Sequence, residues 1–295
     1  MDLEKLTTEK RNDKTMGLDS YSSLEILKIM NKEDGVVPKA IQEQLEPIHA
    51  AVEKIIETFN NGGRLFYIGA GTSGRLGILD AVECVPTFGT PPEMVQGLIA
   101  GGEGAMIKAV EGAEDDFTLA EKELLERGIT EKDTVVGIAA SGRTPYVIGG
   151  LKFARQLGAN TVSLSCNKEA EISKEAEISI EVEVGAEVLT GSTRLKSGTA
   201  QKLVLNMLST TAMIGIGKVY NNLMVDVQPT NEKLRVRAVR IIMQATDADL
   251  ETATKAYEAA DLHVKTAIVM ILCDVSAEEA RQRLTTSKGF IKNAL

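Results

Sequence analysis

The stretch Arg64–Glu83, RLFYIGAGTSGRLGILDAVE, decides the fold. Its apolar run Leu65–Ile68 has the length and aromatic content of a buried parallel strand. Small residues follow, and the apolar spacing after them is that of a helix. A strand, a tight turn and a helix start predict an anion site, because unpaired backbone N–H groups and the positive end of the helix dipole point above the turn. Thr72 and Ser73 add hydroxyl donors that suit phosphate oxygens.

The same turn contains the pattern G-x-G-x-x-G, from Gly69 to Gly74, which is typical of dinucleotide-binding turns. That motif expects an acidic residue after the next strand, for the ribose. Glu93 lies near the expected spacing but precedes the next apolar run, and Glu103 lies further along the chain. We therefore rank nucleotide binding second, after a simple anion site. A third interpretation is that the glycines serve only a tight turn.

Apolar runs bounded by turn residues predict further strands with helices between them. Their alternation with short connections predicts an α/β fold, a doubly wound and mostly parallel sheet flanked by helices. The expected strands are Met94–Ala100, Thr134–Ala139, Thr161–Cys166 and Ile178–Val184. The expected helices include Ile41–Phe59, a segment holding Met106, Ile107 and Val110, Leu119–Arg127, and a helix from about Gly198 to Ile216.

The ends of the chain have a different character. Residues 1–20 are polar and weakly periodic, so we expect an irregular lead-in, and then a helix capped by Ser22 that buries Leu24, Ile26 and Leu27. Pro86 and the Pro91-Pro92 pair are expected to end the helix that carries Glu83. From Val219 onward strand signals vanish, which predicts a small C-terminal helical bundle. We expect a helical lead-in at 1–50, an α/β domain at 51–218 and a helical region at 219–295.

Two more polar turns resemble the first one. Ser141, Arg143 and Thr144 stand between a predicted strand and a predicted helix, repeating the Ser-Gly-Arg order of the first turn. Ligands of open α/β sheets bind at the carboxyl ends of strands, where the topology reverses, so the two turns are expected to meet there. The third turn, Thr190–Ser197, holds Ser192, Arg194 and Lys196, whose charges could neutralise a phosphate dianion. These turns predict a phosphate-binding site; a simple helix cap with solvated basic residues is the alternative for the third.

Composition excludes several classes of protein. The chain has 295 residues with 43% hydrophobic and 25% charged residues, as in soluble globular proteins. Its net charge of −9 argues against nucleic-acid binding, and no apolar run approaches the roughly 20 residues that span a membrane. The N-terminus lacks the apolar core of a signal peptide, and three scattered cysteines suit a reducing cytoplasm. We expect chemistry by carboxylates, without metal.

Four stretches of the chain resemble the sugar-isomerase (SIS) fold and, more closely, the N-acetylmuramic acid 6-phosphate etherase family. They are Arg64–Gly89, Gly97–Glu114, Gly137–Gly158 and Gly185–Leu208, and the segments Leu6–Asn12 and Asn222–Leu234 are similar to that family too. The resemblance implies cleavage of the lactyl ether of N-acetylmuramic acid 6-phosphate in peptidoglycan recycling, by a homodimer without a cofactor. It also implies that Glu83 is the catalytic acid and Glu114 the second catalytic glutamate.

The implied reaction suits two carboxyl groups. Opening the sugar ring exposes an aldehyde whose C2 proton is acidic, its removal expels lactate from C3, and water then adds at C3. One group must take a proton and the other must supply one, and different environments can divide these roles. If the two glutamates are not catalytic, Glu83 is a residue of a solvated helix face and Glu114 belongs to a charged loop. Two other functions remain open: a non-catalytic sugar-phosphate sensor, and an aldose–ketose isomerase of the same fold.

Overall fold

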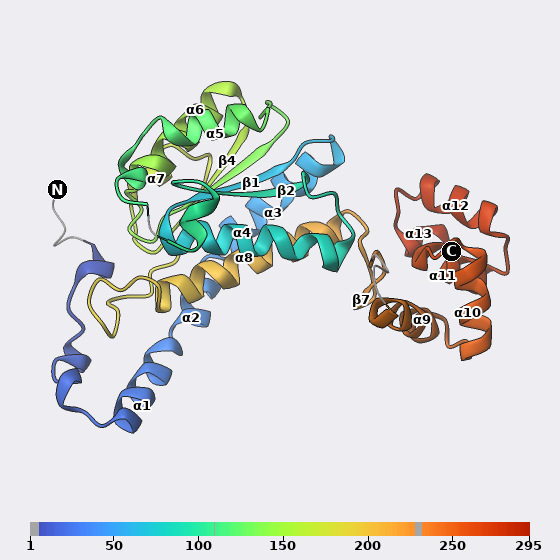
Figure 1. Cartoon of the computed structure of the whole chain (residues 1–295), viewed down its shortest axis with the longest axis horizontal. Helices are drawn as coiled ribbons and strands as arrows, with labels where there is room; N and C mark the ends of the chain where they lie inside the picture. Colours follow the sequence, from blue (N-terminus) through green and yellow to red (C-terminus); the bar gives the residue numbers. More distant parts are fainter. Residues whose placement is uncertain (1–5, 109, 228–231) are drawn as a thin grey trace. The chain divides into compact units, whose positions relative to one another are not determined.

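A computed structural model describes residues 6–108, 110–227 and 232–295. One part of the chain is built around a sheet that includes β1, β2 and β4 (Figure 1). This five-stranded sheet has the order β2-β1-β3-β4-β5, and every neighbouring pair of its strands is parallel. The predicted doubly wound parallel sheet is therefore confirmed. The strands are β1 Leu65–Gly69, β2 Val95–Ile99, β3 Thr134–Ile138, β4 Asn160–Ser165 and β5 Ile178–Glu181.

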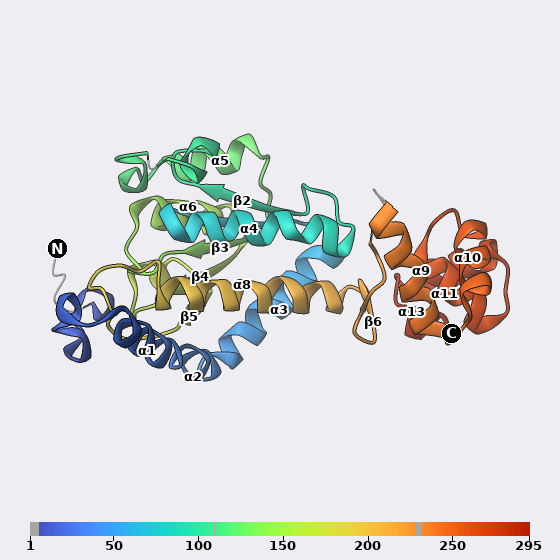
Figure 2. The same ribbon diagram turned by 60° about the horizontal axis from the view of Figure 1, so that its bottom comes forward.

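Helices cover both faces of the sheet (Figure 2). Side chains of β1 alternate between the two layers: a Cβ at Gly150 on α6 would lie 2.5 Å from Ile68, and a Cβ at Gly77 on α4 would lie 2.8 Å from Tyr67. Phe66 and Ile68 belong to the core that β1 shares with α5 and α6. The helices of this region are α3 Leu45–Asn60, α4 Gly71–Phe88, α5 Leu119–Glu126, α6 Pro145–Leu157, α7 Glu171–Lys174 and α8 Lys196–Gly215.

The N-terminal lead-in is irregular, as expected, although residues 1–5 lie outside the described part. Its described residues form 3-10 turns at Thr7–Glu9, Asp13–Thr15 and Leu18–Ser20. Helix α1, Ser23–Asp34, begins with a capping box between Ser22 and Glu25. The expected burial of its apolar face is wrong for Leu24 and Leu27, which are 59% and 61% exposed, whereas Ile26 is partly buried. Its buried residue is instead Glu33.

Two expectations about where helices begin and end are corrected. The expected helix Ile41–Phe59 is divided into α2, Val37–Gln42, and α3, which begins at Leu45. Pro47 accounts for the break, because it lacks the N–H that would bond the carbonyl of residue 43 and its ring would clash there. Pro86, in contrast, does not end the helix that carries Glu83: α4 continues to Phe88 with Pro86 inside. In that last turn a proline removes one hydrogen bond while the buried Cys84 and Phe88 keep the helix packed.

Two further expectations about secondary structure are wrong. The segment holding Met106 and Val110 forms no α-helix among its described residues; a 3-10 helix spans Glu103–Met106. Glycines 101 and 102 before it have positive φ angles of 91° and 73°, which an α-helix does not accommodate. After position 219 the chain still forms strands, β6 Val219–Tyr220 and β7 Leu223–Met224, an antiparallel pair too short for a visible sequence pattern.

The chain divides into two compact units. The first comprises residues up to Val82 and Glu93–Ser209, and the second comprises Glu83–Pro92 and Thr210–Leu295. The second unit contains the predicted helical bundle, which is confirmed from Glu232 on; residues 228–231 of the expected helical region lie outside the described residues. Its helices are α9 Glu232–Thr246, α10 Leu250–Ala259, α11 Val264–Cys273, α12 Ala277–Thr286 and α13 Ile291–Ala294. Within the described residues, no helix has the length and apolarity to cross a bilayer.

Candidate functional site

The first two polar turns emerge side by side from the sheet. Strands β1 and β3 are direct parallel neighbours, with Gly69 opposite Ile138 at their carboxyl ends. The chain leaves β1 toward β2 on one side and leaves β3 toward β4 on the other, so the topology reverses between them. Ligands of open α/β sheets bind at such a position. The predicted meeting of the two Ser-Gly-Arg turns is therefore confirmed.

The first turn places its hydroxyls in the first turn of α4. Gly74 allows a close approach of helix and strand, because a Cβ there would lie 2.6 Å from the carbonyl oxygen of Gly69. Ser73 is 7% exposed, and its hydroxyl donates to Oε1 of Gln201 on α8 at 3.0 Å. Nε2 of Gln201 is buried without a hydrogen-bond partner among the described residues. The hydroxyl of Ser73 is therefore already hydrogen-bonded, while Nε2 of Gln201 on α8 still has N–H groups to donate.

The second turn surrounds Ser141, whose hydroxyl oxygen accepts from the backbone N–H of Arg143 at 3.3 Å. Gly142 has a φ of 73°, and a Cβ there would lie 2.4 Å from Cβ of Ala170, so only glycine fits. Thr144 is the N-cap of α6, yet its side chain makes no capping hydrogen bond. Ser141, Arg143 and Thr144 are all partly exposed, so a ligand can reach them.

The third turn adjoins the first one. A Cβ at Gly198, near the start of α8, would lie 3.5 Å from Cγ2 of Thr72. Ser192 is partly exposed and Arg194 is exposed before this helix start. The buried carboxylate of Glu187 accepts from the N–H groups of Lys196 at 3.0 Å and Ser197 at 2.9 Å. The N-terminus of α8 therefore already holds an anion from its own chain.

Lys196 is buried and paired. Its ammonium lies 3.1 Å from Oε2 of Glu33, and the two side chains are 3% and 5% exposed. Burial disfavours the charged carboxylate, but hydrogen bonds from Lys14, Asn12 and Lys196 outweigh it and lower the pKa of Glu33 to about 2. Removing one partner of a buried ion pair costs about 3–5 kcal/mol, because the other charge is left uncompensated. Lys196 and Glu33 therefore depend on each other in the folded protein.

The N-terminal lead-in is hydrogen-bonded to the second turn through Asn167. The Asn167 amide donates to the carbonyl of Ala140 at 3.1 Å and to the hydroxyl of Thr8 at 3.0 Å. Its oxygen accepts from the backbone N–H and the hydroxyl of Thr7, both at 2.8 Å. Asn167 is 3% exposed. The lead-in is thus held at the edge of the sheet where the turns meet.

The two predicted catalytic glutamates are both exposed. Glu83 lies on α4, about three turns after Thr72. Glu114 lies in the 3-10 turn Ala113–Asp115, and Ala113 packs against the core that includes α6. The structure therefore fixes the turn that carries Glu114 onto the helix that follows the second polar turn.

A buried carboxylate one turn before Glu83 joins α4 to α8. Asp80 accepts from the hydroxyl of Tyr67 at 2.9 Å and from the hydroxyl of Ser209 at 3.1 Å. Burial raises its pKa to about 6, against the opposing effect of these hydrogen bonds. We did not single out Asp80, Glu33, Asn167 or Glu187 in the sequence, because each is defined by a partner distant along the chain and no local pattern marks it.

Comparisons with known proteins agree with this architecture. The family model described as the glucokinase regulatory protein N-terminal SIS domain matches residues 47–155, and the SIS domain model matches residues 120–211. A phosphoheptose isomerase from Francisella tularensis superposes with a TM-score of 0.51 at 16% identity, over 66% of this chain and 100% of that chain. At that identity the likeness concerns the fold alone, which is of SIS type.

Full-length relatives identify the family. An N-acetylmuramic acid 6-phosphate etherase of Exiguobacterium sp. is 65% identical over 293 residues, 99% of this chain and 100% of that protein. N-acetylmuramic acid 6-phosphate etherase 2 of Lactiplantibacillus plantarum is 64% identical over 295 residues, the whole of both chains. The chain therefore belongs to the N-acetylmuramic acid 6-phosphate etherase family.

Proposed function

We propose that this chain cleaves the D-lactyl ether of N-acetylmuramic acid 6-phosphate, giving N-acetylglucosamine 6-phosphate and D-lactate in the recycling of peptidoglycan amino sugars. The observation that carries the proposal is the 65% identity to a named etherase over 99% of the chain. The two Ser-Gly-Arg turns at the topological switch point support it, because they provide donors where a sugar phosphate would bind.

The phosphate is held by groups of the three turns. Thr72, Ser141, Thr144 and Ser192 supply hydroxyl donors. Ser73 adds a donor when its hydroxyl turns from Oε1 of Gln201 to the phosphate. Two cations, Arg143 and Arg194, have the exposure to meet a phosphate dianion, and a guanidinium binds phosphate oxygens through two N–H groups. Lys196 belongs to the site through its place at the start of α8.

Catalysis proceeds by elimination and addition. The open-chain aldehyde makes the C2 proton acidic, and Glu114 removes it. Glu83 protonates the ether oxygen as the C3–O bond breaks, so lactate leaves with its original oxygen. Water then adds at C3 of the unsaturated aldehyde, and a proton returns to C2. Each glutamate acts as a general acid or base, a role that typically contributes 10²–10⁴-fold.

The active form is a homodimer in the cytoplasm. Four apolar residues of the first 27 support this assembly by their exposure: Met16 at 52%, Tyr21 at 38%, Leu24 at 59% and Leu27 at 61%. Leu79 and Val82 on α4 are 49% and 60% exposed as well. Exposed apolar surface of this kind is typical of protein–protein contacts.

The test is direct. Purified protein is incubated with N-acetylmuramic acid 6-phosphate, and D-lactate and N-acetylglucosamine 6-phosphate are quantified. Equal amounts of both products are expected. Release of a ketose phosphate without lactate would favour an isomerase, and binding of the sugar phosphate without turnover would favour a sensor; either result would overturn the proposal.

A further inference from the structure

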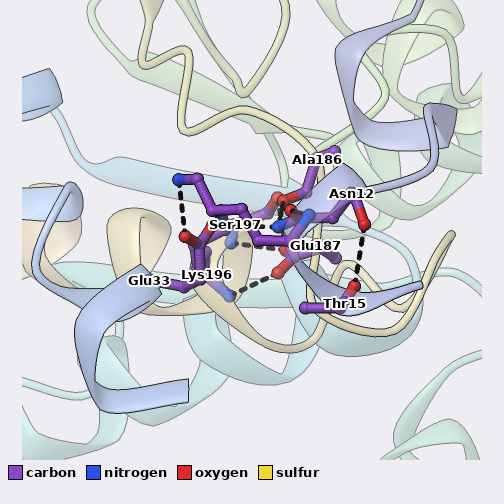
Figure 3. A network of polar contacts seen from close by, with 8 residues as sticks. Asn12, Thr15, Glu33, Ala186, Glu187, Lys196 and Ser197 are labelled. Atoms are coloured by element: carbon purple, nitrogen blue, oxygen red, sulfur yellow. Dashed lines mark hydrogen bonds and ion pairs between the residues drawn. The ribbon is translucent and has the colours of Figure 1, made fainter. Parts of the chain in front are cut away.

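The N-terminal lead-in and the start of α8 both donate hydrogen bonds to the carboxylate of Glu33, at the end of α1 (Figure 3). Oε2 accepts from Lys196 at 3.1 Å and from the amide of Asn12 at 2.9 Å, and Oε1 accepts from Lys14 at 2.8 Å. Asn12 also donates to the carbonyl of Ala186 at 3.2 Å, next to the residue that caps α8. The lead-in, α1 and the start of α8 are thereby joined through one buried anion.

We infer that Lys196 is a positioning residue, which with Glu33 holds the third turn and the lead-in against the sugar-phosphate site and does not itself contact the phosphate. This inference rests on the proposed function and narrows the role of one residue within it. Glu33 becomes a positioning residue of the same kind. Arg143 and Arg194 are then the cations that contact the phosphate directly.

The charges around Lys196 support this role. If its ammonium turned to a phosphate, the buried carboxylate of Glu33 would lose its fully buried cation and would then lie near a second anion. Lys14, the other cation on Glu33, is 66% exposed and is screened by water. The backbone of Lys196 is also held, because its N–H donates to Glu187. The side chain and the backbone N–H of Lys196 are therefore both hydrogen-bonded within the protein, to Glu33 and to Glu187.

A double-mutant cycle separates positioning from direct contact. KM and kcat for lactate release are measured for wild type, Glu33→Gln, Lys196→Met and the double variant. A positioning pair predicts that each single variant raises KM at least tenfold, because each leaves one buried charge uncompensated. It also predicts that the double variant returns KM to within about threefold of wild type, because no unpaired buried charge remains. We expect kcat to stay within about twofold throughout.

Direct contact predicts a different cycle. Glu33→Gln would then leave KM unchanged or lower it by releasing the ammonium, and the double variant would be as poor as Lys196→Met; that result would overturn the inference. Lys14→Met is the matched control, since it removes the exposed cation from the same carboxylate, and we expect it to change KM less than threefold.

A second measurement uses wild-type protein, in case a variant does not fold. Lysine acetylation by acetic anhydride is mapped by mass spectrometry with and without inorganic phosphate. Lys196 is expected to stay unmodified in both samples, while the exposed Lys14 reacts in both. Modification of Lys196 that phosphate prevents would overturn the inference. A wild-type protein that releases no lactate would instead overturn the proposed function, and the acetylation comparison would still test the placement of Lys196.

Discussion

The hydroxyl of Ser73 on α4 donates to Oε1 of Gln201 on α8 at 3.0 Å, so the first turn is bonded to a helix that begins 123 residues later. The Ser141 hydroxyl of the second turn takes part in one hydrogen bond among the described residues, accepting from Arg143. The two equivalent serines therefore differ in how much structure depends on them.

Ser141→Ala and Ser73→Ala should separate binding from stability. Each removes a hydroxyl that would donate to phosphate, which for Ser73 requires its proton to turn from Oε1 of Gln201, so each should weaken substrate binding by about 1.5–3 kcal/mol and raise KM accordingly. Ser73→Ala should in addition lower the free energy of unfolding by about 1–3 kcal/mol, because it leaves buried Gln201 without a partner. KM and urea unfolding are measured, with the exposed Ser20→Ala as control. Equal turnover of the unphosphorylated sugar would contradict the assignment of these turns to phosphate.

Isotopes test the elimination route. Turnover in D2O should place deuterium at C2 of N-acetylglucosamine 6-phosphate, because the abstracted proton exchanges with solvent. Labelled water should place its oxygen at C3, and D-lactate should keep its ether oxygen. Mass spectrometry and NMR of both products read these positions. Lactate that carries the solvent oxygen would mean that the bond on the lactate side breaks, which contradicts elimination from C3.

Glu83→Gln should stop the expulsion of lactate and leave substrate binding intact. A glutamine cannot protonate the departing oxygen, so kcat should fall by 10²–10⁴-fold while KM changes little. Exchange of the C2 proton in D2O should persist in this variant, because Glu114 removes that proton. Glu114→Gln, in contrast, should lose both the C2 exchange and the release of lactate. If Glu83→Gln abolishes the exchange and Glu114→Gln retains it, the two roles are reversed.

The buried Asp80 should make stability depend on pH. Its pKa of about 6 in the folded protein lies above the ordinary value of 3.8, so the folded state holds a proton that the unfolded state has released. The unfolding free energy should therefore fall as the pH rises from about 4 to 6 and stay lower above 6, by about 3 kcal/mol in total.

Asp80→Asn removes this titration. Urea unfolding of wild type and variant at pH 4.5 and 7.5 isolates the effect, since other groups contribute equally to both proteins. Wild type should lose more stability than the variant between the two pH values. An equal loss in both proteins would show that Asp80 does not titrate in this range.

Sedimentation should find a dimer. Leu24→Glu with Leu27→Glu places two charges on the exposed apolar face of α1, and this double variant should weaken the association. Lys28→Glu, on the same helix but at a polar position, is the control. A wild-type monomer with full activity at assay concentrations would contradict the proposed dimer.

Local patterns in the sequence determined the layout of the sheet. The run Leu65–Ile68 and the turn after it predicted β1 and the start of α4, because strand and helix periods and small turn residues act over a few positions. The repeated Ser-Gly-Arg order predicted which turns would meet. The same local rules failed at Met106 and Pro86, where a glycine-rich segment and tertiary packing decided the conformation.

Tertiary structure alone decided which charges are available at the site. Lys196 and Arg194 look alike in the sequence, yet one is buried on Glu33, 163 residues away, and the other is exposed. Asn167 and Thr7 are likewise joined across 160 residues. A side chain's desolvation and its partners depend on what the fold brings beside it. For that reason the sequence predicted where phosphate should bind, and only the fold decided that the Lys196 ammonium is already paired.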